Sequence, residues 1–117
     1  MIEREIKGED YIVRYDPQTM TVTFDGELSL GSSAEYEPIK KLLEAVVASE
    51  PETMTLDVKK VSFLNSAGIS MLSKFVIALR KHEGTQLIVV GTEAMPWQVK
   101  SLKNLKKFLP SLQLIIE

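Results

Sequence analysis

The feature that most limits the fold of this chain is the alternation of single strand-like segments with amphipathic helical segments. Apolar residues recur at helical spacing in three stretches, which we expect to start between Ala34 and Pro38, at Asn65 or Ser66, and at Trp97. Short runs rich in apolar residues lie between and after these stretches, at 54–58, 86–90 and 112–116. Helices that alternate with single strands favour parallel strands joined by right-handed crossovers.

A β-hairpin is predicted ahead of this alternating part. Tyr11–Tyr15 and Thr21–Phe24 are rich in β-branched and aromatic residues, and Asp16–Thr19 between them carries turn chemistry around Pro17. The hairpin adds an antiparallel pair of strands. The predicted fold class is therefore α/β, with a mixed β-sheet made of an opening β-hairpin plus parallel strands, and with α-helices stacked on that sheet.

Polar residues, proline and glycine indicate where the helices begin and end. Ser32 and Glu35 have the spacing of a capping box, and Pro38 fits the first turn of a helix. Gly84 is a plausible left-handed residue at the end of the second helix. These residues give the expected limits of the first two helices.

The length and charge of the chain restrict its class. Its 117 residues predict a single domain over 1–117, and 14 Lys and Arg against 16 Asp and Glu give a net charge of −2, which argues against a dedicated nucleic-acid binder. Lys100, Lys103 and Lys107 share one face of the last helix, with Lys106 adjacent. We interpret them as a solvating face, with a protein contact as the alternative. No heptad pattern is present, so a monomer or weak dimer is expected.

Residues typical of enzymes and metal sites are scarce. The chain has no cysteine and a single histidine, His82, and it has no nucleotide P-loop and no GxSxG motif. We therefore predict no catalytic residues, no metal and no cofactor. Six of the first ten residues are charged, unlike the start of a signal peptide, and the longest apolar run is Phe75–Leu79. The expected location is the cytoplasm, without membrane contact.

The segment most open to a functional interpretation is Phe63–Ile69. A strand and a short loop are expected before it, and a helix is expected to begin at Asn65 or Ser66, which are both good N-cap residues. Gly68 then falls in the first helical turn, where glycine costs up to about 1 kcal/mol relative to alanine. On the residues alone, close packing explains this glycine more simply than a flat surface that a partner approaches.

This segment resembles the signature loop of STAS domains, and specifically that of bacterial anti-sigma factor antagonists. In that loop, Asp, Ser, Ser or Ala, and Gly follow two apolar residues. Phe24–Leu28, Leu56–Val58 and Leu87–Gly91 are similar to the family's strands around the loop. The resemblance covers the chain from Tyr11 onward.

The resemblance implies a regulatory binding domain without catalysis. In that family a serine at the start of the second helix is phosphorylated by an anti-sigma factor, a serine kinase of histidine-kinase-like ATPase fold. The unphosphorylated domain binds this factor and frees the sigma factor for transcription, and a PP2C-type phosphatase resets the switch. By position, the resemblance implies that Ser66 is the phosphorylation site and that the partner contacts Asn65, Ser66, Ala67, Gly68 and Ile69.

Two departures from the family pattern keep an alternative open. Asn65 stands where Asp is usual, so no carboxylate lies beside the acceptor hydroxyl. The segment Ser29–Pro38 is longer than usual, and its Tyr36 and Glu37 are candidates for further partner contacts. The alternative is a STAS-like sensory domain that binds a small molecule, nucleotide or lipid, or that binds a partner protein without phosphorylation.

Overall fold

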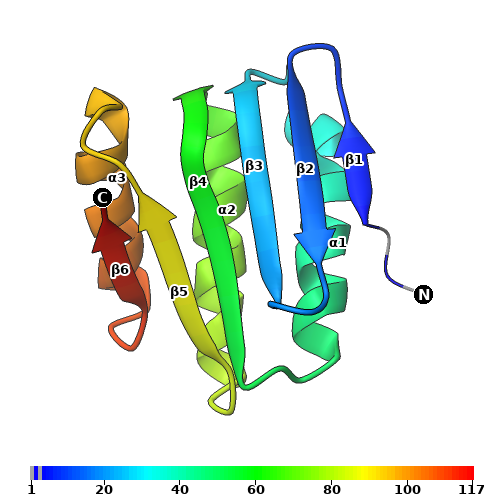
Figure 1. Cartoon of the computed structure of the whole chain (residues 1–117), viewed down its shortest axis with the longest axis vertical. Coiled ribbons are helices and arrows are strands. Elements are labelled where there is room, and N and C mark those ends of the chain that lie inside the picture. The colour runs from blue at the N-terminus through cyan, green and yellow to red at the C-terminus, as the bar shows by residue number, and fades with distance from the viewer. Residues whose placement is uncertain (1, 3) are drawn as a thin grey trace.

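The six strands follow one another across one mixed sheet in sequence order in the computed structural model, which describes residues 2 and 4–117. The antiparallel part is made of β1 (Glu5–Lys7), β2 (Tyr11–Asp16) and β3 (Thr21–Leu28). The strands that continue parallel to β3 are β4 (Thr53–Leu64), β5 (Gln86–Gly91) and β6 (Gln113–Ile116). The predicted combination of an opening hairpin, here β2 and β3, with parallel strands is confirmed (Figure 1).

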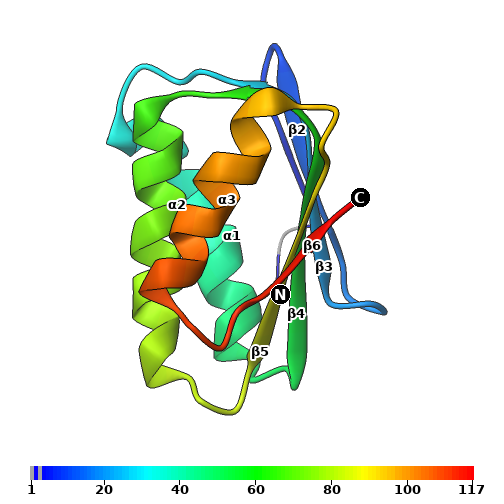
Figure 2. The same ribbon diagram turned by 90° about the vertical axis from the view of Figure 1, so that its left-hand side faces the viewer.

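The three α-helices lie together on one face of the sheet (Figure 2). They are α1 (Glu37–Ala48), α2 (Ser66–Ala78) and α3 (Pro96–Phe108). A 3₁₀ helix, Ser33–Tyr36, leads into α1, and another, Leu79–Lys81, extends α2. In Figure 1, α2 lies between the other two helices, and in the described part of the chain no helix covers the opposite face of the sheet.

The core fills the space between the sheet and the helices. Alternate residues of the strands are buried there, such as Val22 and Phe24 in β3, as a half-buried strand requires. α1 buries its whole apolar stripe, and Pro38 occupies its first turn as predicted. Gln98, at the start of α3, is the one buried polar side chain among the described residues, with 0% exposure.

The strand before α2 is longer than predicted. β4 continues from the expected segment to Leu64, so the short loop predicted before Phe63 does not exist. The register against β3 shifts twice, between Thr23 and Asp25 and between Gly26 and Glu27, so β4 carries two bulges. The strand therefore delivers the chain directly to the first residue of α2.

α1 begins within the predicted range, but two predicted signals for the helix ends, the capping box and the left-handed Gly84, are wrong. Glu35 accepts the N–H of Gly31 at 2.6 Å, and the side chain of Ser32 makes no capping bond, so the capping box does not form. Gly84 lies beyond α2 and its 3₁₀ extension and is not left-handed; Gly26, with φ 104°, is the one glycine with positive φ in the described chain. The extension into a 3₁₀ helix ends α2 without a glycine.

Candidate partner-binding site

The candidate site lies where β4 passes into α2, at the edge where the parallel strands have their carboxyl ends. Leu64 is the last residue of β4, Asn65 is the N-cap and Ser66 is the first residue of α2. The Asn65 N–H donates to the carbonyl of Leu28, the last residue of β3, at 3.1 Å. This tight connection fixes the start of α2 against the neighbouring strand.

The side chain of Asn65 uses both ends of its amide. Its Oδ1 accepts the N–H of Gly68 at 2.9 Å, which confirms Asn65 as the N-cap. The same oxygen accepts the hydroxyl of Tyr36 at 2.7 Å, and Nδ2 donates to the carbonyl of Leu30 at 2.8 Å. An ionised aspartate has no proton to donate to Leu30. The loop ahead of α1 therefore selects asparagine at this position.

Tyr36 belongs to the interior and not to the surface. It is 1% exposed, and its hydroxyl also lies 3.0 Å from the carbonyl of Leu28 and accepts the N–H of Leu30 at 3.3 Å. Burial raises the pKa of the Tyr36 hydroxyl above its ordinary value. The expectation that Tyr36 contacts a partner is thus wrong, because its side chain fastens the loop to α2.

Gly68 is buried beneath the same network. A Cβ atom at this position would come within 2.4 Å of Leu64 Cδ1 and 2.8 Å of the Tyr36 hydroxyl oxygen. Both contacts are far closer than packed atoms allow, so the first turn of α2 approaches Tyr36 only because residue 68 lacks a side chain. Of the two interpretations of this glycine, the structure supports close packing.

Ser66 is the exposed member of the predicted contact set. Asn65, Ala67 and Ile69 are half-buried, and Gly68 is buried. Within the described residues, the side chain of Ser66 makes no hydrogen bond, and the N–H groups of Ser66 and Ala67 meet no acceptor, as expected in a first helical turn. The hydroxyl of Ser66 is therefore free to react with or to contact another protein.

Phe63 is a surface residue beside this site that the sequence analysis did not single out. Its side chain is 46% exposed, although it lies in β4 opposite Glu27 of β3. The second bulge leaves both Ser62 and Phe63 on the exposed side. The bulge gave no signal in the sequence, so the exposure of this aromatic ring was not predictable.

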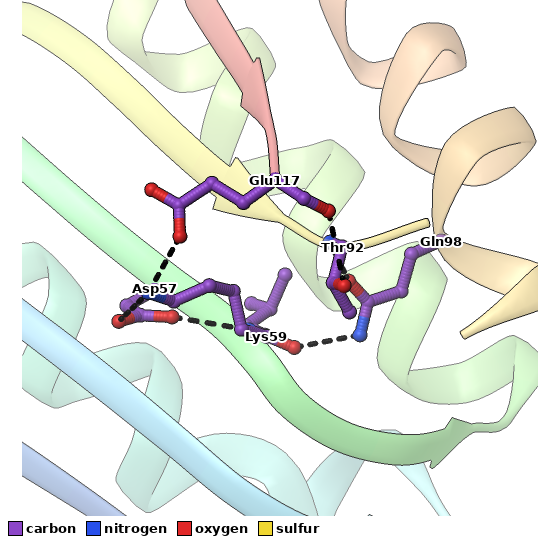
Figure 3. Close-up of polar contacts among 6 residues, drawn as sticks. Asp57, Lys59, Thr92, Gln98 and Glu117 are labelled. Carbon is purple, nitrogen blue, oxygen red and sulfur yellow. Dashed lines mark hydrogen bonds and ion pairs between the residues drawn. The ribbon is translucent and has the colours of Figure 1, made fainter. Parts of the chain in front are cut away.

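A polar cluster supports the first bulge of β4 (Figure 3). The Nε2 of Gln98 donates to the carbonyls of Val58 and Val61 at 2.7 and 3.0 Å, and its Oε1 accepts the N–H of Thr92 at 2.9 Å. The indole N–H of Trp97 reaches the Val61 carbonyl at 3.1 Å. The start of α3 therefore satisfies carbonyls of β4 beyond Asp57, where the pairing of β4 with β5 ends.

The exposed side of this bulge carries an ion pair. Lys59 Nζ lies 3.0 Å from Glu117 Oε1 and 3.9 Å from Asp57 Oδ2. The hydrogen bond to Glu117, with the charge of Asp57, raises the pKa of Lys59. Figure 3 shows Asp57 and Lys59 within β4, with Glu117 just after the end of β6. All groups in the cluster are paired with each other, which indicates a structural role.

The described residues offer no evident place for a metal ion. They contain no group of three or more His, Cys, Asp or Glu residues with suitable geometry. No helix among them has the length and apolar character to cross a membrane.

The chain matches the family model of the STAS domain over residues 10–113. Curated protein sequences give no significant match. Among solved structures, SiaC of Pseudomonas aeruginosa is similar with a TM-score of 0.77 and 17% identity, over 100% of this chain and 98% of SiaC. A chain in the complex of the diguanylate cyclase SiaD with its activator SiaC, from the same organism, matches with a TM-score of 0.75 and 16% identity, over 97% of this chain and 98% of that one.

An anti-sigma factor antagonist from Mycobacterium paratuberculosis has the same fold. Its TM-score is 0.66 at 23% identity, and the match covers 92% of this chain and 90% of that protein. At these identities the structural matches show a shared fold and no more.

Proposed function

Because this chain belongs to the STAS domain family, we propose that it is a non-catalytic regulatory binding domain, similar to anti-sigma factor antagonists and switched by phosphorylation of Ser66. The observation that carries the proposal is the position of Ser66. It is exposed, it is the first residue of α2, and its hydroxyl has no partner among the described residues. The proposed partners are a cytoplasmic anti-sigma factor with a histidine-kinase-like ATPase fold and a PP2C-type phosphatase.

The helix start suits a charge switch. A phosphate adds about −1.5 to −2 charge at pH 7. The unpaired N–H groups of Ser66 and Ala67 and the positive end of the helix dipole stabilise that charge. The fold thus survives phosphorylation, while an interface shaped for a neutral hydroxyl rejects the charged form through repulsion and desolvation.

The proposed contact surface consists of Ser66 and its neighbours Asn65, Ala67 and Ile69. Gly68 contributes indirectly, because its lack of a side chain lets the first turn of α2 pack against Tyr36. Phe63 adds an exposed aromatic side chain next to this surface. Aromatic residues are frequent anchors in protein interfaces. The partner is therefore expected to cover Phe63 and Ser66 together.

A second candidate function is partner binding without phosphorylation. The Asn65 amide is held at both ends by Gly68, Tyr36 and Leu30, and it lacks the carboxylate that could orient a kinase or its metal. SiaC, which shares the fold, is described as the activator of the diguanylate cyclase SiaD. This observation favours a domain that controls another enzyme by binding alone.

A binding experiment with phosphopeptide analysis separates the two candidates. Ser66→Ala and Ser66→Asp are used as baits against anti-sigma factors with histidine-kinase-like domains from the same cells. Ser66→Ala should retain the partner and Ser66→Asp should lose it, and Ser66 should be found phosphorylated in cells. Ser111→Asp, which adds the same charge at an exposed residue outside the site, is the matched control. Binding of Ser66→Asp as tight as that of the wild type excludes the charge switch.

A further inference from the structure

The charges of this chain are divided between two of its helices and the rest of the molecule. α2 with its 3₁₀ extension, Ser66–Lys81, and α3, Pro96–Phe108, contain seven basic residues and no acidic residue. The remainder of the chain carries seven basic residues against all 16 acidic ones. A protein with a net charge of −2 thus presents a strongly basic surface on one part of its helical layer.

The outward side of α2 is neutral and has small side chains. Ser66, Ser70, Ser73 and Ile77 follow one another at helical spacing, on the side opposite the buried residues of α2. We call this stripe the α2 ridge. Ile77 is 40% exposed, and with Phe63 just before the helix it is one of the two large apolar side chains that are exposed in the described chain. The α2 ridge therefore has one exposed apolar group, Ile77, near its C-terminal end.

Basic residues border the α2 ridge on both sides. Lys40 of α1 and Lys74 of α2 line the groove between these helices, together with Ser70 and one acidic residue, Glu37. On the other side α3 meets α2 through Trp97 and Ser101, and the exposed Lys100, Lys103 and Lys107 lie on the outer side of α3. Figure 2 shows α2 and α3 as adjacent helices on the side of the molecule away from the sheet. The borders of the ridge thus carry mainly positive charge, and its centre carries none.

We propose that this surface, the α2 ridge with the outer lysines of α3, docks an acidic protein whose contact face is apolar at its centre. The exposed Ile77 gains from burial against apolar groups, and the lysines attract carboxylates at the rim. This surface includes Ser66 at its N-terminal end. A nucleic acid would leave the neutral centre of the ridge without a matching group, and the acidic remainder of the chain repels phosphates.

This inference deepens the proposed switch and, for the role of phosphate, depends on it. A phosphate on Ser66 stands at the start of the α2 ridge and cancels part of the positive charge around it. An acidic partner then meets a negative group where it met a hydroxyl. The charge of the partner, in this view, is the reason why phosphorylation of Ser66 releases it.

The test is an NMR titration with a defined probe, a synthetic amphipathic helical peptide with leucines on one face and glutamates on the others. Amide shifts should change in Ser66–Lys81 and Pro96–Phe108. The variant K100E/K103E/K107E should bind about tenfold more weakly, since each lysine borders the docking face. The variant R4E/K7E/K60E changes the net charge equally, at exposed residues outside this face, and should bind like the wild type. Thermal melts confirm that both variants fold.

Three results overturn the inference. They are equal weakening by both triple variants, shift changes confined to the sheet, and tighter binding of duplex DNA or of phosphatidylserine vesicles than of the peptide. Ser66→Asp adds an independent arm and should weaken peptide binding several-fold. If the lysine variants behave as expected but Ser66→Asp binds the peptide like the wild type, docking of an acidic partner is supported and the phosphorylation switch is excluded. If only Ser66→Asp weakens peptide binding, the phosphorylation switch is supported and the proposed role of the α3 lysines in docking is excluded.

Discussion

The hydroxyl of Tyr36 donates a 2.7 Å hydrogen bond to Oδ1 of Asn65, which lies 29 residues further along the chain. The same Oδ1 accepts the N–H of Gly68 inside α2. The loop ahead of α1 and the first turn of α2 are thus joined at one oxygen atom. The shape of the surface around Ser66 depends on both segments.

Removal of this hydroxyl should destabilise the fold. Tyr36→Phe leaves the Leu30 N–H without an acceptor and deprives Asn65 of one donor, in a buried environment. The free energy of unfolding should fall by about 1–3 kcal/mol, the cost of unsatisfied buried polar groups. Urea denaturation measures this change. Tyr11→Phe, which removes the hydroxyl of a half-buried tyrosine, is the control and should change little.

The raised pKa of Tyr36 predicts a loss of stability in alkali. Burial favours the neutral hydroxyl in the folded state, so the pKa lies above the ordinary value of 10.0. The stabilisation is complete below that value and disappears as the pH rises through the folded-state pKa. Melting temperatures between pH 8 and pH 11 should therefore fall more steeply for the wild type than for Tyr36→Phe. Parallel curves would contradict this assignment.

Restoring the aspartate usual in the family should weaken the loop. Asn65→Asp keeps the acceptor for Gly68 but puts a carboxylate oxygen against the carbonyl of Leu30. We expect a loss of about 1–3 kcal/mol, partly offset by the helix dipole, and faster amide exchange in residues 29–36. Asn104→Asp, at an exposed position of α3, is the control for the change in charge. An unchanged exchange rate would show that Nδ2 is not needed.

Two glycine substitutions should differ in effect. Gly68→Ala improves helix propensity, yet its methyl group would collide with Leu64 and Tyr36. Overpacking should dominate and cost about 1–3 kcal/mol. Gly84→Ala meets no atom within 4 Å and has no positive φ, so its effect should stay within about 0.5 kcal/mol. Calorimetric melting of both variants shows whether steric overpacking or helix propensity determines the effect of an alanine at residue 68.

Charge at Ser66 should be compatible with folding. Ser66→Asp places a carboxylate in the first turn of α2 at an exposed position, where the helix dipole favours it. Its free energy of unfolding should stay within about 1 kcal/mol of the wild type, and that of Ser66→Ala likewise, because Asn65 supplies the cap. Failure of Ser66→Asp to fold would place the side chain in the interior.

The periodicity of the sequence predicted the hairpin, the three helices and the parallel strands, because each of these elements buries a regular stripe. It missed β1, since Ile6 is the only apolar residue in Glu5–Lys7 and three residues show no alternation. It also ended β4 too early. Val58 is followed by Lys59 and Lys60, which interrupt the alternation because the strand bulges there.

The candidate site was predictable in part. Residue type predicted a cap at Asn65 or Ser66 without choosing between them, and the proposed role of Ser66 followed from the resemblance to STAS loops. The burial of Tyr36 depends on a hydrogen bond between distant segments, which no local pattern encodes. Gln98 was missed for a related reason, since its burial depends on hydrogen bonds to the carbonyls of Val58 and Val61, which are distant in sequence.

The uneven distribution of charge also affects how quickly this protein meets other molecules. Seven basic residues on α2, its extension and α3 oppose an acidic remainder, so the molecule has a large dipole moment despite a net charge of −2. The electric field of a charged partner orients such a molecule before contact. At 0.1 M salt this effect acts only when the two surfaces are within about 10 Å of each other. Added salt should therefore slow association strongly, while the lifetime of the complex, which the contacts themselves determine, changes little.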